Sequence, residues 1–167
     1  MTNLSQVSQL IVARSPGLRL FARQWGDAAT ADDVVQTALV SLLSQRKLPD
    51  DPVAWMYRTV RNAAIDAARA GDRRKRREQT VAMERGDWFE ATIDNALDAA
   101  DAETALRQLP NESREVVVLR LWGDLGFAAI AEVLGISVST AHSRYTSALE
   151  QLKQKLEPAC RPISKRD

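Results

Sequence analysis

The sequence predicts an all-α fold built from two small helical domains. Apolar residues recur three or four positions apart along almost the whole chain, and the alternating pattern typical of strands is absent. The single β-branched run, 116–118, lies inside a helical period. A stretch rich in carboxylates separates two helix-rich segments. We therefore expect domains at 5–79 and 101–157, an acidic linker at 80–100 and a tail at 158–167.

Composition excludes several classes of function. The 167 residues are 45% hydrophobic and 27% charged, as in water-soluble globular proteins. No run approaches the roughly 20 apolar residues that cross a bilayer, and the first residues lack a secretory signal, so we expect a cytoplasmic protein without a membrane partner. The lone cysteine, Cys160, and the lone histidine argue against a disulfide or a zinc site. We expect no metal, cofactor or small-molecule substrate.

The first domain is expected to begin with two helices. One covers about 17–25. The next begins at Thr30, whose hydroxyl forms a capping-box pattern with Asp33 three residues later. The apolar stripe of this second helix is formed by Val34/Val35, Ala38/Leu39 and Leu42/Leu43.

A third helix is expected from 52 to 70, ending at Gly71. Asp51 can cap it, and Pro52 suits its first position because the N–H that proline lacks would be unpaired there. Charge is segregated just beyond: residues 69–77 hold six arginines and lysines against one aspartate, whereas residues 84–103 hold seven carboxylates and one arginine. The basic block is either a surface that meets a polyanion or a solvated linker.

One face of this third helix combines cations with an amide. It carries Arg58, Arg61, Asn62, Ile65 and Arg69. Such a stripe suits phosphates and unpaired bases. Trp55 and Tyr57 could stack on bases, although we interpret Trp55 as a core residue.

The second domain contains a helix-turn-helix pattern. A helix is expected at 112–122, followed by two short helices on either side of Gly135, which can adopt the left-handed conformation that ends a helix. An apolar face on the first of these is formed by Ile130, Ala131 and Leu134. Ser137 or Ser139 can cap the second, which would enter the DNA major groove.

The outer face of that recognition helix is polar and carries few charges. It presents Ser139, His142, Ser143, Thr146 and Ser147. Small polar side chains and an imidazole suit base edges and phosphates. The alternative is an ordinary helical hairpin, but the glycine, the cap and the spacing favour DNA binding. We interpret His142 as a DNA contact because it lies on this face and has no metal partner.

Three segments in this order resemble the extracytoplasmic-function (ECF) sigma factors of the sigma-70 family. They are ADDVVQTAL (31–39), WMYRTVRNAAIDAAR (55–69) and residues 106–152. The resemblance covers nearly the whole chain and places sigma domain two before sigma domain four. It implies a bacterial transcription initiation factor, not an enzyme. Such a protein binds core RNA polymerase, recognises the −10 and −35 promoter elements and promotes DNA melting. An anti-sigma factor is a further partner that the resemblance implies.

The resemblance also assigns functional residues. It places polymerase binding on Asp32, Asp33, Val35, Gln36 and Leu39. With the basic stripe, the expected −10 contacts are Arg58, Arg61, Asn62, Asp66, Arg69, Arg73 and Arg74. The expected −35 contacts are Arg120, Ser137, Ser139, Thr140, His142, Ser143, Arg144, Thr146 and Ser147. The family commonly has cations where this chain has His142 and Ser147, which predicts fewer released counterions.

Two other readings compete with this one. The first is a helix-turn-helix regulator that acts without polymerase, but it would need neither the DDVVQ helix nor the basic stripe at 58–77. The second is a helical enzyme. No nucleophile–base pair, phosphate loop or metal cluster in the sequence supports it.

Overall fold

The computed structural model describes residues 4–78 and 104–156, and within these ranges the chain is helical with no strand. The all-α prediction is confirmed. The predicted linker and tail lie outside the described residues. A helical turn at 104–107 accompanies six longer helices: α1 (Leu4–Ala22), α2 (Ala28–Leu43), α3 (Pro52–Glu78), α5 (Asn111–Leu121), α6 (Phe127–Leu134) and α7 (Val138–Leu156). None of the described helices is long and apolar enough to span a membrane.

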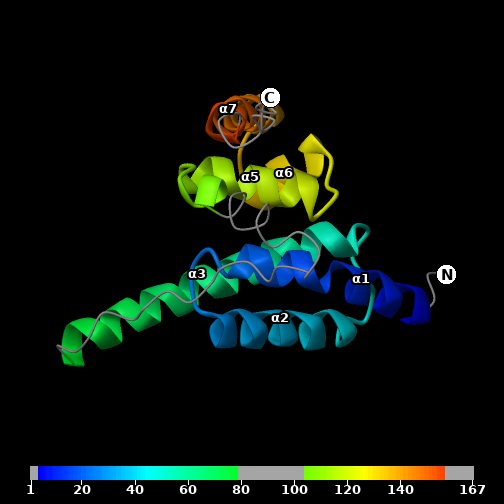
Figure 1. Cartoon of the computed structure of the whole chain (residues 1–167). Helices are drawn as coiled ribbons and strands as arrows, with labels where there is room; N and C mark the ends of the chain where they lie inside the picture. Colours follow the sequence, from blue (N-terminus) through cyan, green and yellow to red (C-terminus); the bar gives the residue numbers. More distant parts are fainter. Residues whose placement is uncertain (1–3, 79–103, 157–167) are drawn as a thin grey trace, which may run out of the picture.

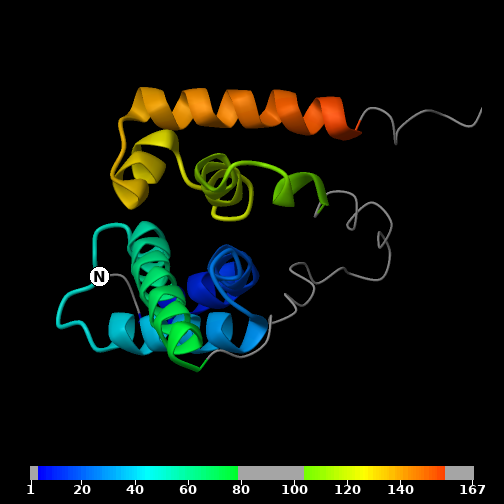
Figure 2. The same cartoon turned by 90° about the vertical axis from the view of Figure 1, so that its left-hand side faces the viewer.

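The helices form two groups stacked on each other. We call α1–α3 the first domain and residues 104–156 the second domain. In Figure 1 and Figure 2, α2 lies below α1 and α3, α5 and α6 lie above them, and α7 covers the top. Contacts of α5 with α1 and of α6 with α3 join the groups. The buried side chains of both groups form one continuous hydrophobic cluster.

Helix α1 is longer than predicted and begins much earlier. The sequence pattern predicted a helix at about 17–25, but the helix runs from Leu4 to Ala22 with Pro16 inside it. Proline removes one backbone hydrogen bond in a helix interior and therefore argued against continuation. The helix continues because its apolar face is buried on both sides of Pro16, through Val7, Ile11, Leu18 and Phe21.

The start of α2 also differs from the prediction. Its N-cap is Asp27, whose Oδ1 accepts a hydrogen bond from the Thr30 N–H at 2.8 Å. This bond stabilises the carboxylate and lowers the pKa of Asp27. Thr30 therefore lies inside the first turn and is not the cap.

Helix α3 begins as predicted but ends later. The Ala54 N–H donates to Asp51 Oδ1 at 2.9 Å, which confirms the predicted cap. The helix does not end at Gly71 and continues to Glu78. Lysine and arginine fill its last turn, where cations interact favourably with the helix dipole. The basic block is thus a continuous helical extension that projects beyond the bundle (Figure 1).

The helix-turn-helix geometry is confirmed. Gly135 ends α6 in the left-handed conformation with φ of 67°, and the Thr140 N–H donates to Ser137 Oγ at 3.1 Å. Helix α7 was predicted to be short, but it spans 19 residues. Its length follows from packing, because buried Ala141 and Ala148 continue its inner face along α5.

Candidate nucleic-acid interface

The basic extension of α3 offers an open cationic surface. Among the expected −10 contacts, the exposed side chains are Asn62, Asp66, Arg69, Arg73 and Arg74. Arg69 lies 4.0 Å from the carboxylate of Asp66, an exposed pair of little energetic weight. Further along, Arg73, Arg74 and Arg77 line a shallow hollow of about 330 Å³. This arrangement can hold phosphate groups without any catalytic chemistry.

The structure places Arg58 and Arg61 differently from the other expected −10 residues. Arg61 donates from Nε to Glu115 Oε1 at 2.7 Å and from Nη2 to Oε2 at 3.4 Å. Arg58 Nη1 lies 3.3 Å from Glu132 Oε1. Both carboxylates belong to the second domain, so these two arginines face protein here and not solvent alone.

The expected polymerase-binding residues on α2 divide into two sets. Asp32, Asp33 and Gln36 are exposed, and Asp32 pairs with Arg19 at 2.9 Å. Leu39 is half-buried. Val35 is only 2% exposed and packs in the core of the first domain.

Two apolar residues on α2 were missed as surface residues. Val40 is 64% exposed and Leu43 is 49% exposed. The expected apolar stripe included both Leu42 and Leu43, but only Leu42 is buried. Positions 33, 36, 40 and 43 follow helical spacing, which the sequence already showed. They form one exposed face that joins polar and apolar side chains.

The recognition helix α7 exposes a mostly uncharged face. His142, Ser143, Thr146 and Ser147 are exposed, and the Thr146 hydroxyl donates to the backbone oxygen of His142 at 3.0 Å. At the start of the helix, Ser139 is exposed and Thr140 half-buried. The hydroxyls of both lie within hydrogen-bond distance of the capping Ser137, so these three residues order the helix start.

Arg144 turns away from the exposed face of α7. Its Nη2 lies 2.8 Å from Glu112 Oε2 of α5. Among the expected −35 contacts, Arg144 is therefore paired within the second domain in this structure.

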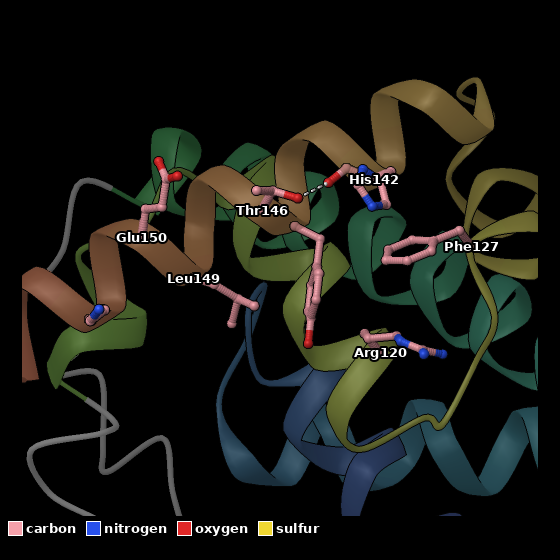
Figure 3. A pocket seen from close by; sticks show the side chains of 8 residues that line it. Arg120, Phe127, His142, Thr146, Leu149 and Glu150 are labelled. Atoms are coloured by element: carbon pink, nitrogen blue, oxygen red, sulfur yellow. Dashed lines mark hydrogen bonds between the residues drawn. The ribbon is translucent and has the colours of Figure 1, made fainter.

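An aromatic cluster organises the base of this surface. The rings of Phe127 and His142 meet edge to face with centroids 5.1 Å apart, and the Phe127–Tyr145 distance is 5.5 Å. The guanidinium of Arg120 lies 5.2 Å from the Phe127 centroid and donates to the backbone oxygen of Leu125 at 2.9 Å. Figure 3 shows Phe127 between Arg120 and His142. These side chains line an open hollow of about 380 Å³.

Phe127 was not predicted as a site residue. An aromatic residue at the start of a helix usually indicates core packing, and only the folded structure brings it beside His142. Its ring contacts two of the expected DNA-binding side chains at once, so it fixes their relative positions.

Comparison with known proteins first defines the class. The family Sigma-70 region 2 matches residues 11–74, and the family Sigma-70, region 4 matches residues 100–152. The first match covers most of α1–α3, and the second contains the helix-turn-helix. The basic surface of α3 and the polar surface of α7 therefore belong to a sigma-70-type protein.

Individual relatives narrow this assignment. The ECF RNA polymerase sigma factor SigL of Mycobacterium tuberculosis is 32% identical over an alignment 146 residues long, and the alignment covers 83% of this chain and 81% of SigL. The RNA polymerase sigma-H factor of Pseudomonas aeruginosa is 30% identical over an alignment 160 residues long, and the alignment covers 86% of this chain and 82% of that protein. The chain belongs to the ECF sigma factors of the sigma-70 family, as predicted.

A solved structure shares the fold. It is the sigma factor RpoE from Bartonella quintana, solved in complex with the anti-sigma factor NepR. It is 22% identical, with a TM-score of 0.74 over 95% of this chain and 98% of that one.

Proposed function

We propose that this sigma factor directs core RNA polymerase to promoters by dividing three contacts among three helices. Helix α2 binds polymerase, α3 reads and holds the melted −10 element, and α7 reads the −35 element. One observation carries the proposal. The chain has a basic helix followed by a capped helix-turn-helix, in the same order as in the family. The protein acts by binding and supplies no catalytic group.

The polymerase contact is assigned to the exposed face of α2. Polar Asp33 and Gln36 lie at helical spacing from apolar Val40 and Leu43, a combination suited to a protein partner. Val35 supports this face from within the core and does not touch the partner. An anti-sigma factor that covers the same surfaces stays an expectation from the family.

The −10 contact combines charge with base recognition. The exposed amide of Asn62 offers a donor and an acceptor to a base edge. The exposed arginines beyond it track the phosphates of the strand. Unstacking a base costs a few kcal/mol, and contacts that accept the base offset this cost.

The −35 contact relies more on hydrogen bonds to base edges than on charge. His142 and the surrounding hydroxyls read base edges in the major groove, and Arg120 holds a phosphate at the edge of the hollow. Since core polymerase and the chromosome share one compartment, the proposed site of action is the bacterial cytoplasm.

Transcription from defined templates tests the proposal. Purified chain plus core polymerase should give run-off products from selected promoters, and core polymerase alone should give none.

Replacing Asp33 and Gln36 with alanine should weaken polymerase binding in a competition assay while the protein stays folded. Asn62→Ala should reduce permanganate reactivity of the melted region more than it reduces polymerase binding. Duplex binding without polymerase binding or transcription would instead support the helix-turn-helix regulator.

A further inference from the structure

Helix α7 begins with an exposed apolar side chain. Val138 is the first residue of the helix and is 51% exposed. Isolated apolar side chains are common on protein surfaces, so exposure alone assigns no role. The position of Val138 distinguishes it, because the N-terminal residues of a recognition helix reach base edges in the major groove. Side chains of a helix also lean toward its N-terminus, so Val138 projects from the tip of α7.

The backbone that carries Val138 is held on both sides. Before it, the Ile136 N–H donates to the backbone oxygen of Ala131 at 3.0 Å. After it, the Ala141 N–H donates to the backbone oxygen of Ser137 at 3.0 Å, which starts the regular bonding of α7. Valine adds rigidity of its own, because branching at Cβ restricts χ1. Val138 therefore presents its methyl groups in a defined position at little cost in conformational entropy.

The hydroxyls beside Val138 contact one another. Ser137 Oγ lies 3.0 Å from Ser139 Oγ and 2.7 Å from Thr140 Oγ1, and it accepts from the Thr140 N–H at 3.1 Å. These contacts use part of the hydrogen-bonding capacity that the hydroxyls could offer to a base. Val138 shares its side of the helix with His142, which lies four positions later and is also exposed. The tip of α7 therefore places an apolar group beside a polar one.

The major groove offers one apolar group to such a side chain. Each base pair presents hydrogen-bond donors and acceptors there, and thymine adds a C5-methyl group. Cytosine, the other pyrimidine, presents an amino donor and lacks this methyl group. Packing of the methyl group against Val138 removes apolar surface of both partners from water, which is favourable. The chemistry of Val138 therefore favours thymine over cytosine.

We infer that Val138 contacts the C5-methyl group of a thymine in the −35 element and so determines the base at that position. The inference deepens the proposed role of α7 in −35 recognition and rests on it. Val138 carries no charge, so it contributes discrimination between sequences without changing the dependence of binding on salt.

Replacement of thymine by deoxyuridine tests the contact. Deoxyuridine lacks the C5-methyl group and keeps the hydrogen-bonding groups of thymine. The full chain and core polymerase form the holoenzyme, whose binding is measured by competition on a promoter selected by run-off transcription. Each thymine of the −35 element is replaced in turn, on either strand, while the −10 element stays the same. One replacement should weaken binding of the wild-type holoenzyme roughly two- to fivefold, as expected for about one buried methyl group.

Variants of Val138 assign this penalty to one side chain. In Val138→Ala the penalty for that deoxyuridine should nearly disappear, whereas Val138→Ile keeps a branched apolar side chain and should retain it. Leu149→Ala is the matched control, because it shortens another apolar side chain of α7 that is 39% exposed. It should keep the full penalty. Any effect of the missing methyl group on the duplex itself is the same for every variant and cancels. Circular dichroism establishes that each variant keeps its helix content.

The outcomes separate the Val138 contact from the proposed function. A deoxyuridine penalty that is equal in wild type and in Val138→Ala would overturn the contact. A selected −35 element in which every thymine can be replaced without loss would overturn it as well. A loss of affinity in Val138→Ala that is the same for all −35 sequences would place Val138 against a different partner and has the same consequence. If scrambling the whole −35 element leaves holoenzyme binding unchanged, the role of α7 in −35 recognition itself fails.

Discussion

The two surfaces assigned to nucleic acid differ in how they attract it. Helix α3 presents guanidinium groups, and its extension exposes Arg69, Arg73 and Arg74. Helix α7 presents hydroxyls and one imidazole, and its Arg144 is turned toward Glu112. Cations give affinity that is sensitive to salt and indifferent to sequence, whereas hydroxyls and rings give discrimination with little long-range attraction. We therefore expect the first domain to supply most of the affinity and the second most of the choice between duplex sequences.

The largest effect is expected from removing charge on α3. Arg73→Ala combined with Arg74→Ala should weaken DNA binding on the order of tenfold at low salt, and should reduce the log–log salt slope by about 1.5–2. All sequences should lose affinity equally. Fluorescence anisotropy across a salt series measures both quantities. Asp72→Ala, which removes a carboxylate from the same turn, should act in the opposite direction. An unchanged slope in the double variant would show that the extension does not meet DNA.

A single charge added to α7 should make the two surfaces more alike. His142→Arg brings a permanent charge, so it should tighten duplex binding and steepen the salt slope by about one unit. It should also change the preferred −35 sequence, because arginine pairs with guanine. His142→Gln is the matched control with an uncharged amide, and it should leave the slope unaltered. Identical slopes and identical sequence rankings for histidine and arginine would mean that position 142 faces away from the duplex.

Phe127 should affect discrimination without affecting charge. Phe127→Ala removes the ring against which Arg120 and His142 lie, and such ring contacts are worth about 0.5–1.5 kcal/mol. The preference for the best −35 duplex over a mismatched one should fall two- to tenfold, with an unaltered salt slope. Phe127→Tyr keeps the ring and should retain the preference. A loss of affinity that is equal for all duplexes would contradict the positioning role.

Two glycines are expected to change stability and leave binding alone, with opposite signs. A Cβ at Gly71 or at Gly135 would meet nothing within 4 Å, so only the backbone differs. Gly135 has φ of 67°, and alanine there should destabilise the second domain by about 1–2 kcal/mol. Gly71 lies inside α3, and alanine there should stabilise the helix by about 0.5–1 kcal/mol. Urea unfolding measures both, and equal signs would contradict this account.

Local chemistry made much of the fold predictable. Asp51, Gly135 and Ser137 act where their short-range patterns placed them, because caps and left-handed turns depend on neighbouring backbone groups. The early start of α1 was not predictable from the same rules, because burial of Val7 and Ile11 outweighs the break expected at Pro16.

The candidate site was predictable as a set of surfaces but not as an arrangement. Periodicity identified the basic face of α3 and the polar face of α7. Periodicity could not show that Glu115 is buried. Residues 115–119 are all buried, so this part of α5 lacks the contrast between an apolar and a polar face on which periodicity depends. Their burial comes from contacts of α5 with α1 and α7, which are distant in sequence. Contacts such as Arg61–Glu115 and Phe127–His142 are likewise set by tertiary packing.

The enclosed position of α5 has a consequence for the lifetime of the free protein. Helices of both domains pack against α5. Separation of the domains would therefore expose apolar side chains of α5 that nothing else in the described chain covers. A molecule that opens without polymerase or DNA to hold it would present this helix to proteases and to other open copies. Turnover in the cell should therefore follow the fraction of open molecules. Variants that loosen the Arg61–Glu115 pair should disappear faster when protein synthesis is stopped.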